Sequence, residues 1–117
     1  GVEQRLVLLD CHILADELTS TEDIFDAIGG LDDENSFTTV PEAYVLLLIH
    51  AEGRQNSVLS TVHGNMFFLK TENGMPWILN LWCNGDSWVV TFCEGLIPHQ
   101  WLRGTRVFSR NQVRLVV

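Results

Sequence analysis

Beyond residue 57, apolar and polar side chains alternate with a period of two, and short turn signals interrupt the alternation. Gly-Asn or Asn-Gly pairs stand at 64–65, 73–74 and 84–85, and these residue types tolerate the positive φ angles of tight hairpins. The pattern predicts strands over 57–63, 66–71, 76–83 and 87–93, joined as an antiparallel meander. The tail from residue 104 is expected to add one or two strands.

Ahead of this region the apolar spacing is helical. Between Val7 and Leu18 most apolar positions fall on one stripe, which predicts a helix. Leu9 and Ile13 lie off the stripe, so a strand over 5–9 is the alternative.

Two further helices are predicted from capping-box spacings. Thr19 with Glu22 indicates a short helix near 20–28, ended by a glycine pair. Thr39 with Glu42 begins a second apolar rhythm that runs to residue 51. That segment is apolar nearly all round, so we expect it to be buried centrally or to lie in a subunit contact. A strand over 43–50 is the competing interpretation.

Together these elements predict one α+β domain spanning residues 1–117. Two or three N-terminal helices would pack on one face of a four- to six-stranded antiparallel meander. A chain of 117 residues is long enough for one sizeable core and short for two.

Strand alternation assigns the side chains of the meander to two faces. The first face is the more uniformly apolar and is predicted to form the core under the helices. Its members are Leu59, Thr61, His63, Met66, Phe68, Lys70, Trp77, Leu79, Leu81, Cys83, Trp88, Val90 and Phe92. The second face gathers Val58, Ser60, Val62, Phe67, Leu69, Ile78, Asn80, Trp82, Val89, Thr91 and Cys93.

This second face is the predicted binding surface, because it mixes large apolar groups with polar ones at mid-strand, as interfaces and ligand sites do. The segment 97–104 would add His99, Trp101 and Arg103 at its rim, since alternate residues of an extended segment project together. The alternative is that the tail folds over the face and buries it. The candidate binding residues are Asn80, Trp82, Thr91, Phe67, Ser60, His99, Trp101 and Arg103.

Composition and charge restrict the class of protein. Apolar residues make up 46% and charged residues 19%, which is typical of a globular chain. No apolar run approaches the length of a membrane span. The net charge of −8 disfavours nucleic acid and anionic membranes as partners. The charge is uneven, with an acidic stretch over 1–42 and four arginines after 95, which are expected to pair internally or to meet a charged partner.

Candidate chemistry is sparse. The three cysteines, Cys11, Cys83 and Cys93, are predicted to be reduced thiols of a cytoplasmic protein, because Cys83 and Cys93 point to opposite faces of their hairpin. The four histidines, His12, His50, His63 and His99, show no zinc-type spacing with them. We expect no metal, no cofactor and no catalytic residue.

The sequence thus predicts a small acidic binding protein that acts through protein–protein contacts, either by self-association as a homo-oligomer or in an inhibitor or immunity-type role. A small-molecule site or a minor enzyme on the same face is the alternative.

Overall fold

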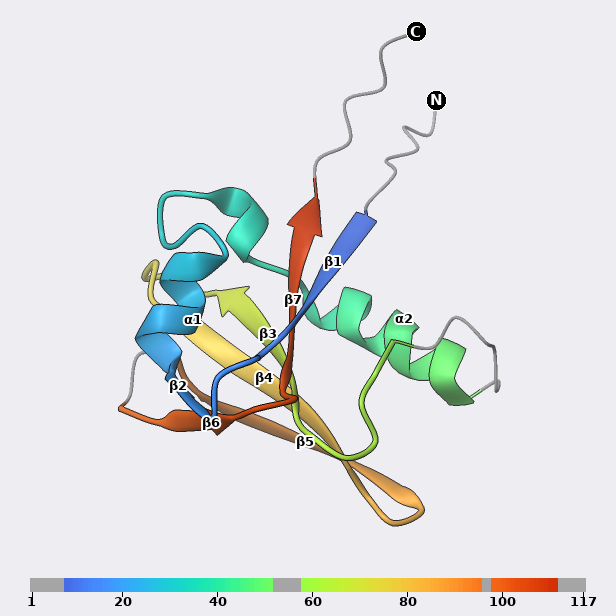
Figure 1. Ribbon diagram of the computed structural model, residues 1–117. Helices are drawn as coiled ribbons and strands as arrows, with labels where there is room; N and C mark the ends of the chain where they lie inside the picture. The colour runs from blue at the N-terminus through green and yellow to red at the C-terminus, as the bar shows by residue number, and fades with distance from the viewer. Residues whose placement is uncertain (1–7, 52–57, 96–97, 112–117) are drawn as a thin grey trace, which may run out of the picture.

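The computed structural model describes residues 8–51, 58–95 and 98–111. In this part of the chain it contains two α-helices and seven strands (Figure 1). In order they are β1 (Leu8–Ile13), β2 (Leu18–Ser20), α1 (Thr21–Ala27), a 3₁₀ turn (Glu34–Ser36), α2 (Val40–Ala51), β3 (Asn65–Lys70), β4 (Pro76–Asn84), β5 (Ser87–Glu94), β6 (Gln100–Leu102) and β7 (Arg106–Asn111).

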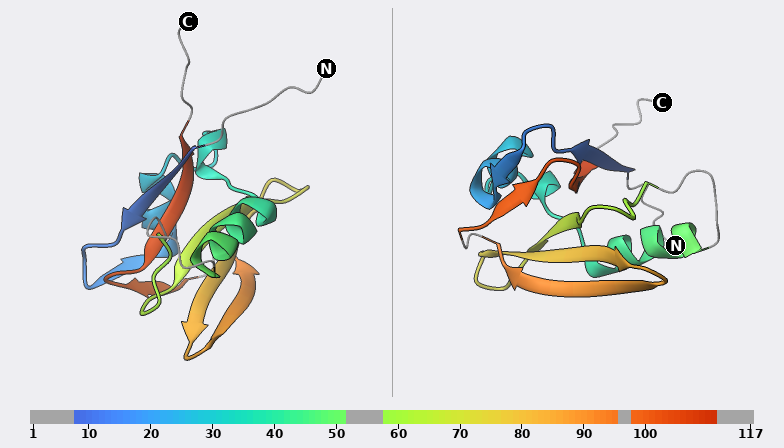
Figure 2. Two further views of the ribbon diagram at one scale, coloured as in Figure 1. Left: turned by 90° about the vertical axis from the view of Figure 1, so that its right-hand side faces the viewer. Right: turned by 60° about the horizontal axis from the view of Figure 1, so that its bottom comes forward.

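The main sheet is mixed, which corrects the predicted antiparallel meander. Its strand order is β1-β7-β3-β4-β5. Only β3, β4 and β5 form the meander, while β7 crosses back to run parallel to β3 and antiparallel to β1. A small second sheet pairs β2 with β6. Figure 2 shows the strong twist between the β1–β7 end and the β4–β5 hairpin.

The two helices cover opposite faces of the main sheet, not one face as predicted. Ile24 and Phe25 of α1 pack with Met66, Phe68, Ile78 and Val107. Ala43 of α2 packs with Phe67, Leu79, Leu81 and Phe108. Consecutive strand residues point to opposite sides, so these clusters lie on different faces, here named the α1 face and the α2 face. A sheet covered on both sides explains why its strands are apolar on both sides.

A helix lies at each of the two places where a capping-box spacing predicts one. At α1 the N-cap is Ser20, whose Oγ accepts from the Asp23 N–H at 3.1 Å, one residue after the predicted Thr19. At α2 the predicted pair is used, because the Glu42 N–H donates to Thr39 Oγ1 at 3.4 Å.

The predicted helix from residue 7 to 18 is wrong. Residues 8–13 form β1, an edge strand paired along its length with β7, and residues 1–7 lie outside the described part. Pairing with a strand nearly a hundred residues away has overridden the local helical spacing.

The predicted strand over 57–63 is also absent, since 58–64 form a loop and residue 57 lies outside the described part. The buried Asn65 side chain organises this loop. Its Oδ1 accepts from the Ser60 N–H at 2.7 Å, and its Nδ2 donates to the carbonyls of Ser60 and Leu81 at 3.0 and 2.9 Å.

The pairing of β3 with β4 differs from the predicted one by a single residue. Lys70 pairs with Pro76, so the connecting loop has five residues, 71–75, and is not the two-residue turn that Asn73-Gly74 suggests. An odd loop length exchanges the faces of one strand relative to the other. Phe67 therefore lies opposite Leu79 on the α2 face, whereas Met66 and Phe68 share the α1 face with Ile78.

Candidate functional site

Three of the predicted binding residues lie on the α1 face of the β4–β5 hairpin. Asn80 pairs with Thr91, and Trp82 pairs with Val89, so all four side chains share that face. Asn80 is half-buried, whereas Trp82 and Thr91 are exposed. The helix α1 covers the other end of the face, around Ile78. Residues 98–111, the described C-terminal part of the chain, do not seal this end of the hairpin, where Trp82 and Thr91 stay exposed.

A cleft of about 340 Å³ lies between this open end, the 62–64 loop and β6. The pairing of β6 with β2 places β6 there. Four predicted side chains meet around the cleft, namely Asn80, Trp82, His99 and Trp101. The predicted site lacks others that surround the cleft, chiefly Val62, His63, Gln100 and Leu102. A strand was predicted over 57–63 where a loop lies, and the β2–β6 pair that positions Gln100 and Leu102 was not predicted.

Trp101 is fixed in the wall of this cleft. Its Nε1–H donates to Thr21 Oγ1 at 2.8 Å, and its ring packs against the cluster under α1. The His99 imidazole meets the Trp101 ring edge-on, with centroids 4.7 Å apart. His99 and Trp101 thus lie side by side. The predicted projection of Arg103 with them is not seen, because its Nε donates to the Ala15 carbonyl at 2.9 Å.

Two glycines leave room for two polar side chains of the cleft. Asn80 Oδ1 accepts from the Asn65 N–H at 3.2 Å, and a Cβ at Gly64 would come within 2.7 Å of that same oxygen. A Cβ at Gly104 would come within 2.4 Å of the His63 ring, and Gly104 has a φ of +93°. Side chains larger than hydrogen at these two positions would push Asn80 or His63 out of place.

Two predicted binding residues lie elsewhere. Phe67 is fully buried on the α2 face and stacks on Phe108, with centroids 4.8 Å apart and an interplanar angle of 8°. Ser60 is buried in the 58–64 loop, where its Oγ accepts from the N–H groups of Val62 and His63. Both are structural residues, and Phe67 was misplaced because of the one-residue register difference.

Sequence reasoning also missed that β5 is an edge strand. In the part of the chain that the structure describes, β5 has β4 as its neighbour on one side and no strand on the other. Most of its residues are exposed, including Val90 and Phe92 at 46% and 52% on the α2 face. The tip of the β4–β5 hairpin projects from the rest of the molecule (Figure 1). No local pattern in the sequence indicates that the C-terminal strand β7 pairs with β3 and not with β5.

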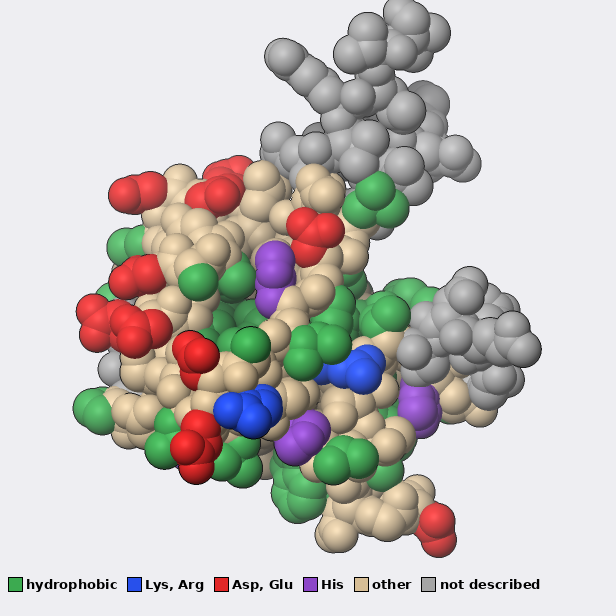
Figure 3. Space-filling model, in the orientation of Figure 1, with side chains coloured by type: hydrophobic (Ala, Val, Ile, Leu, Met, Phe, Trp, Pro, Cys, Tyr) green, Lys and Arg blue, Asp and Glu red, His purple; other side chains and the backbone are tan. Residues whose placement is uncertain are grey.

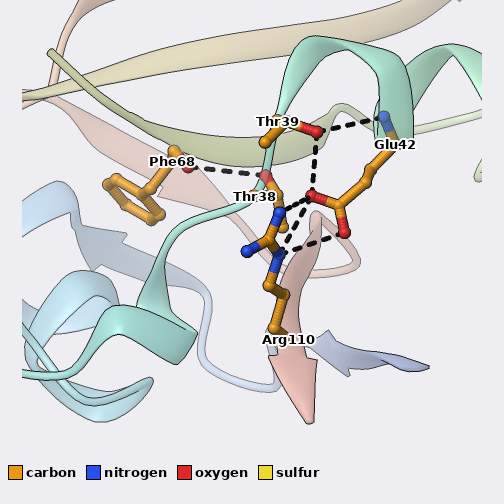
Figure 4. A network of polar contacts seen from close by, with 5 residues as sticks. All are labelled: Thr38, Thr39, Glu42, Phe68 and Arg110. Carbon is orange, nitrogen blue, oxygen red and sulfur yellow. Dashed lines mark hydrogen bonds and ion pairs between the residues drawn. The ribbon is translucent and has the colours of Figure 1, made fainter. Parts of the chain in front are cut away.

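The predicted division of charge, with acidic residues over 1–42 and arginines after residue 95, is seen in part. Acidic side chains gather over α1 and the loop that follows it, on the left in Figure 3. Among the four C-terminal arginines, Arg110 of β7 pairs with Glu42 of α2 through Nε and Nη2, at 2.6–3.1 Å (Figure 4). This charge-assisted bond raises the pKa of the guanidinium. Arg114 lies outside the described residues.

The three cysteines are free thiols. Cys11 and Cys93 are exposed residues, but partial desolvation of each thiol raises its pKa, and at Cys11 this outweighs the nearby Arg106. A raised pKa reduces the thiolate fraction, which does not favour a nucleophilic role. Within the described residues, no three side chains of the metal-binding types come together. None of the helices described there is long and apolar enough to cross a membrane.

Comparison with known proteins found no matching family model, no matching curated protein and no matching solved structure. Function therefore has to be argued from the cleft and the edge strand themselves.

Proposed function

We propose that this protein is a non-enzymatic binding module that self-associates by pairing β5 with β5 of a second copy. The supporting observation is that β5 is an exposed edge strand of eight residues, Ser87–Glu94, with two valines and two aromatic residues. A long apolar edge strand presents unpaired backbone groups and is a template for pairing with another chain.

The hydrogen-bonding pattern of the hairpin identifies the free backbone groups. The Gly95 N–H donates to the Pro76 carbonyl at 2.9 Å, so in β5 the odd-numbered residues use their backbone groups toward β4. The even-numbered residues consequently direct their N–H and C=O groups outward. These residues are Trp88, Val90, Phe92 and Glu94.

An antiparallel pair of two β5 strands satisfies every one of these groups in a single register. Trp88 lies opposite Glu94 of the second copy, and Val90 lies opposite Phe92 of the second copy. The two-fold axis passes between the two Thr91 residues, which form a closely spaced pair that is not hydrogen-bonded. Threonine pairs and aromatic pairs with β-branched residues are favourable across strands.

Charge also fits this arrangement. Glu94 is the only charged residue within β5, and in this register it faces Trp88 of the second copy, not another carboxylate. Most of the described acidic residues of the 1–42 stretch lie over α1 and the loop after it, on the left in Figure 3. The other edge strand, β1, carries Asp10 and His12, and charged residues at an edge oppose strand pairing.

Self-association in the cytoplasm is consistent with the three free thiols. Neither α1 nor the cleft is needed for the pairing, so the two faces of the hairpin remain available in the dimer.

The test is the mass of the protein in solution, measured by sedimentation equilibrium at several concentrations. The wild-type protein should have twice the mass of one chain. Thr91→Arg places two arginines, one from each copy, directly opposite each other at the two-fold axis. Repulsion between their like charges should give monomers. Val90→Pro removes an outward N–H that β4 does not use, so it should also give monomers while the hairpin stays folded.

Leu31→Arg is the matched control, because Leu31 is 58% exposed and lies in the loop after α1. It adds the same charge away from β5 and should leave the dimer intact. Far-UV circular dichroism and the melting temperature show whether each variant is folded. A wild-type protein that stays monomeric at high concentration, or folded Thr91→Arg and Val90→Pro variants that stay dimeric, would contradict the proposal.

A further inference from the structure

The cleft beside β6 has the chemistry of a ligand site. Its volume, about 340 Å³, lies at the lower end of the range for small-ligand pockets. The polar and aromatic residues around it that could meet a ligand are His63, Asn80, Trp82, His99, Gln100 and Trp101.

None of these lining residues is an Asp, Glu, Lys or Arg. A charged ligand that loses water on binding needs an opposite charge or several charge-assisted bonds in its site. This cleft offers amides, imidazoles and indoles instead, so its chemistry selects a neutral ligand.

The polar groups offer both donors and acceptors. Asn80 Oδ1 is used by the Asn65 N–H, so its NH₂ group is the part of that amide left for a ligand. Gln100 supplies a second amide, and His63 and His99 supply one donor and one acceptor each when neutral. Hydroxyl groups, which also donate and accept, match such a set.

Two indoles supply the apolar surface. Trp82 is 36% exposed, and Trp101 is held by its bond to Thr21 and by the cluster under α1. Trp101, fixed in advance, contributes apolar contact with little loss of side-chain freedom, and the more exposed Trp82 ring still has surface that a ligand can cover. The glycines at 64 and 104 leave the space that the Asn80 and His63 side chains occupy.

We propose that this cleft binds a neutral saccharide, with one sugar ring against Trp82 and its hydroxyl groups on Asn80, Gln100 and the two histidines. A sugar ring combines an apolar C–H face with a rim of hydroxyls, which is the combination that the cleft presents. A neutral nucleoside has a stacking face as well, and the experiment separates the two classes.

The experiment is a titration of the ¹⁵N-labelled 117-residue chain, followed by ¹H–¹⁵N spectra. The probes are maltose, cellobiose, lactose and N,N′-diacetylchitobiose, with adenosine as the nucleoside. At least one disaccharide should give saturable shifts of the indole N–H signals of Trp82 and Trp101. Trp82→Ala should weaken binding by at least about tenfold, the effect expected for an aromatic anchor.

Gln100→Ala is a second variant in the exposed part of the cleft and should weaken binding several-fold without loss of the fold. Trp77→Ala is the matched control, because Trp77 is on the same strand with 38% exposure but faces the α2 side. Its affinity should equal that of the wild type. Saturable binding of adenosine alone, no binding of any probe, or equal affinity in the folded Trp82→Ala variant would each overturn the proposal.

Discussion

The contrast between Phe67 and Trp82 tests the register of the sheet. Alternation along the sequence places both aromatic residues on one predicted binding face, whereas the structure places them on opposite faces. Phe67 is 0% exposed and stacks on Phe108, and Trp82 is 36% exposed at the open end of the hairpin. Substitution by alanine should therefore affect the two sites very differently.

For Phe67→Ala we expect a loss of about 3–5 kcal/mol in the free energy of unfolding, because a buried ring is removed and a cavity remains. The stacked contact with Phe108 contributes about 0.5–1.5 kcal/mol of such a loss. In a domain of this length the melting temperature should fall by about 12–20 °C, at about 4 °C per kcal/mol. For Trp82→Ala the expected loss is below about 1.5 kcal/mol, since the indole keeps much of its contact with water.

The assay is urea unfolding of both variants and the wild type, followed by far-UV circular dichroism, at a concentration where all three have the same oligomeric state. The slope of the free energy of unfolding against urea concentration should be the same for all three proteins, so that a shift in the unfolding midpoint reports a change in stability alone. If Phe67→Ala costs less than about 1 kcal/mol, or Trp82→Ala costs as much as Phe67→Ala, the five-residue loop and the register derived from it are wrong.

Two other predictions follow from single side chains. Asn65→Ala should destabilise the protein by more than about 2 kcal/mol in the same urea assay, because the Ser60 N–H and the Ser60 and Leu81 carbonyls lose their buried partner; an unchanged midpoint would contradict this role. Although both side chains are exposed, Cys11 and Cys93 should react with iodoacetamide at pH 7.5 more slowly than the same thiols in the urea-unfolded chain, since partial desolvation raises the pKa of each. Mass spectrometry of tryptic peptides measures the rates, and faster alkylation in the folded protein would contradict the raised pKa values.

Local signals were sufficient for parts of the fold. Asn84 pairs with Ser87, so the loop is Gly85-Asp86 and not the predicted Asn84-Gly85. The pairing shifts by two residues, which leaves the predicted faces of β4 and β5 unchanged. Thr39 with Glu42 located the start of α2, because a capping box involves only neighbouring residues.

Other features depend on contacts between distant segments. The spacing in 7–18 favours a helix, and only pairing with β7 makes residues 8–13 a strand. Nothing in the sequence of α1 or α2 states which face of the sheet each will cover. The Asn73-Gly74 pair is a turn signal whose loop length depends on the Thr71 and Met75 contacts around it. The length of this loop was predicted wrongly, and Phe67 was therefore predicted on the wrong face of the sheet.

The candidate site was affected in the same way. Strand alternation assigned Asn80 and Trp82 to one face, and the predicted neighbours His99 and Trp101 line the same cleft in the structure. His63 and Gln100 were missed because their positions depend on the 58–64 loop and on the β2–β6 pair. Binding by any of these residues stays a prediction.

The place of β7 in the sheet has a consequence for synthesis on the ribosome. Because β7 lies between β1 and β3, β1 has no strand to pair with until β7, which is made after every other described element, has left the exit tunnel. All three strands of the β3–β5 meander are synthesised before β7. Until β7 emerges, the edge of β3 that pairs with it over Asn65–Phe67 stays unpaired. Closure of the domain therefore awaits its final strand, and the nascent chain presents an apolar sheet edge to chaperones until then.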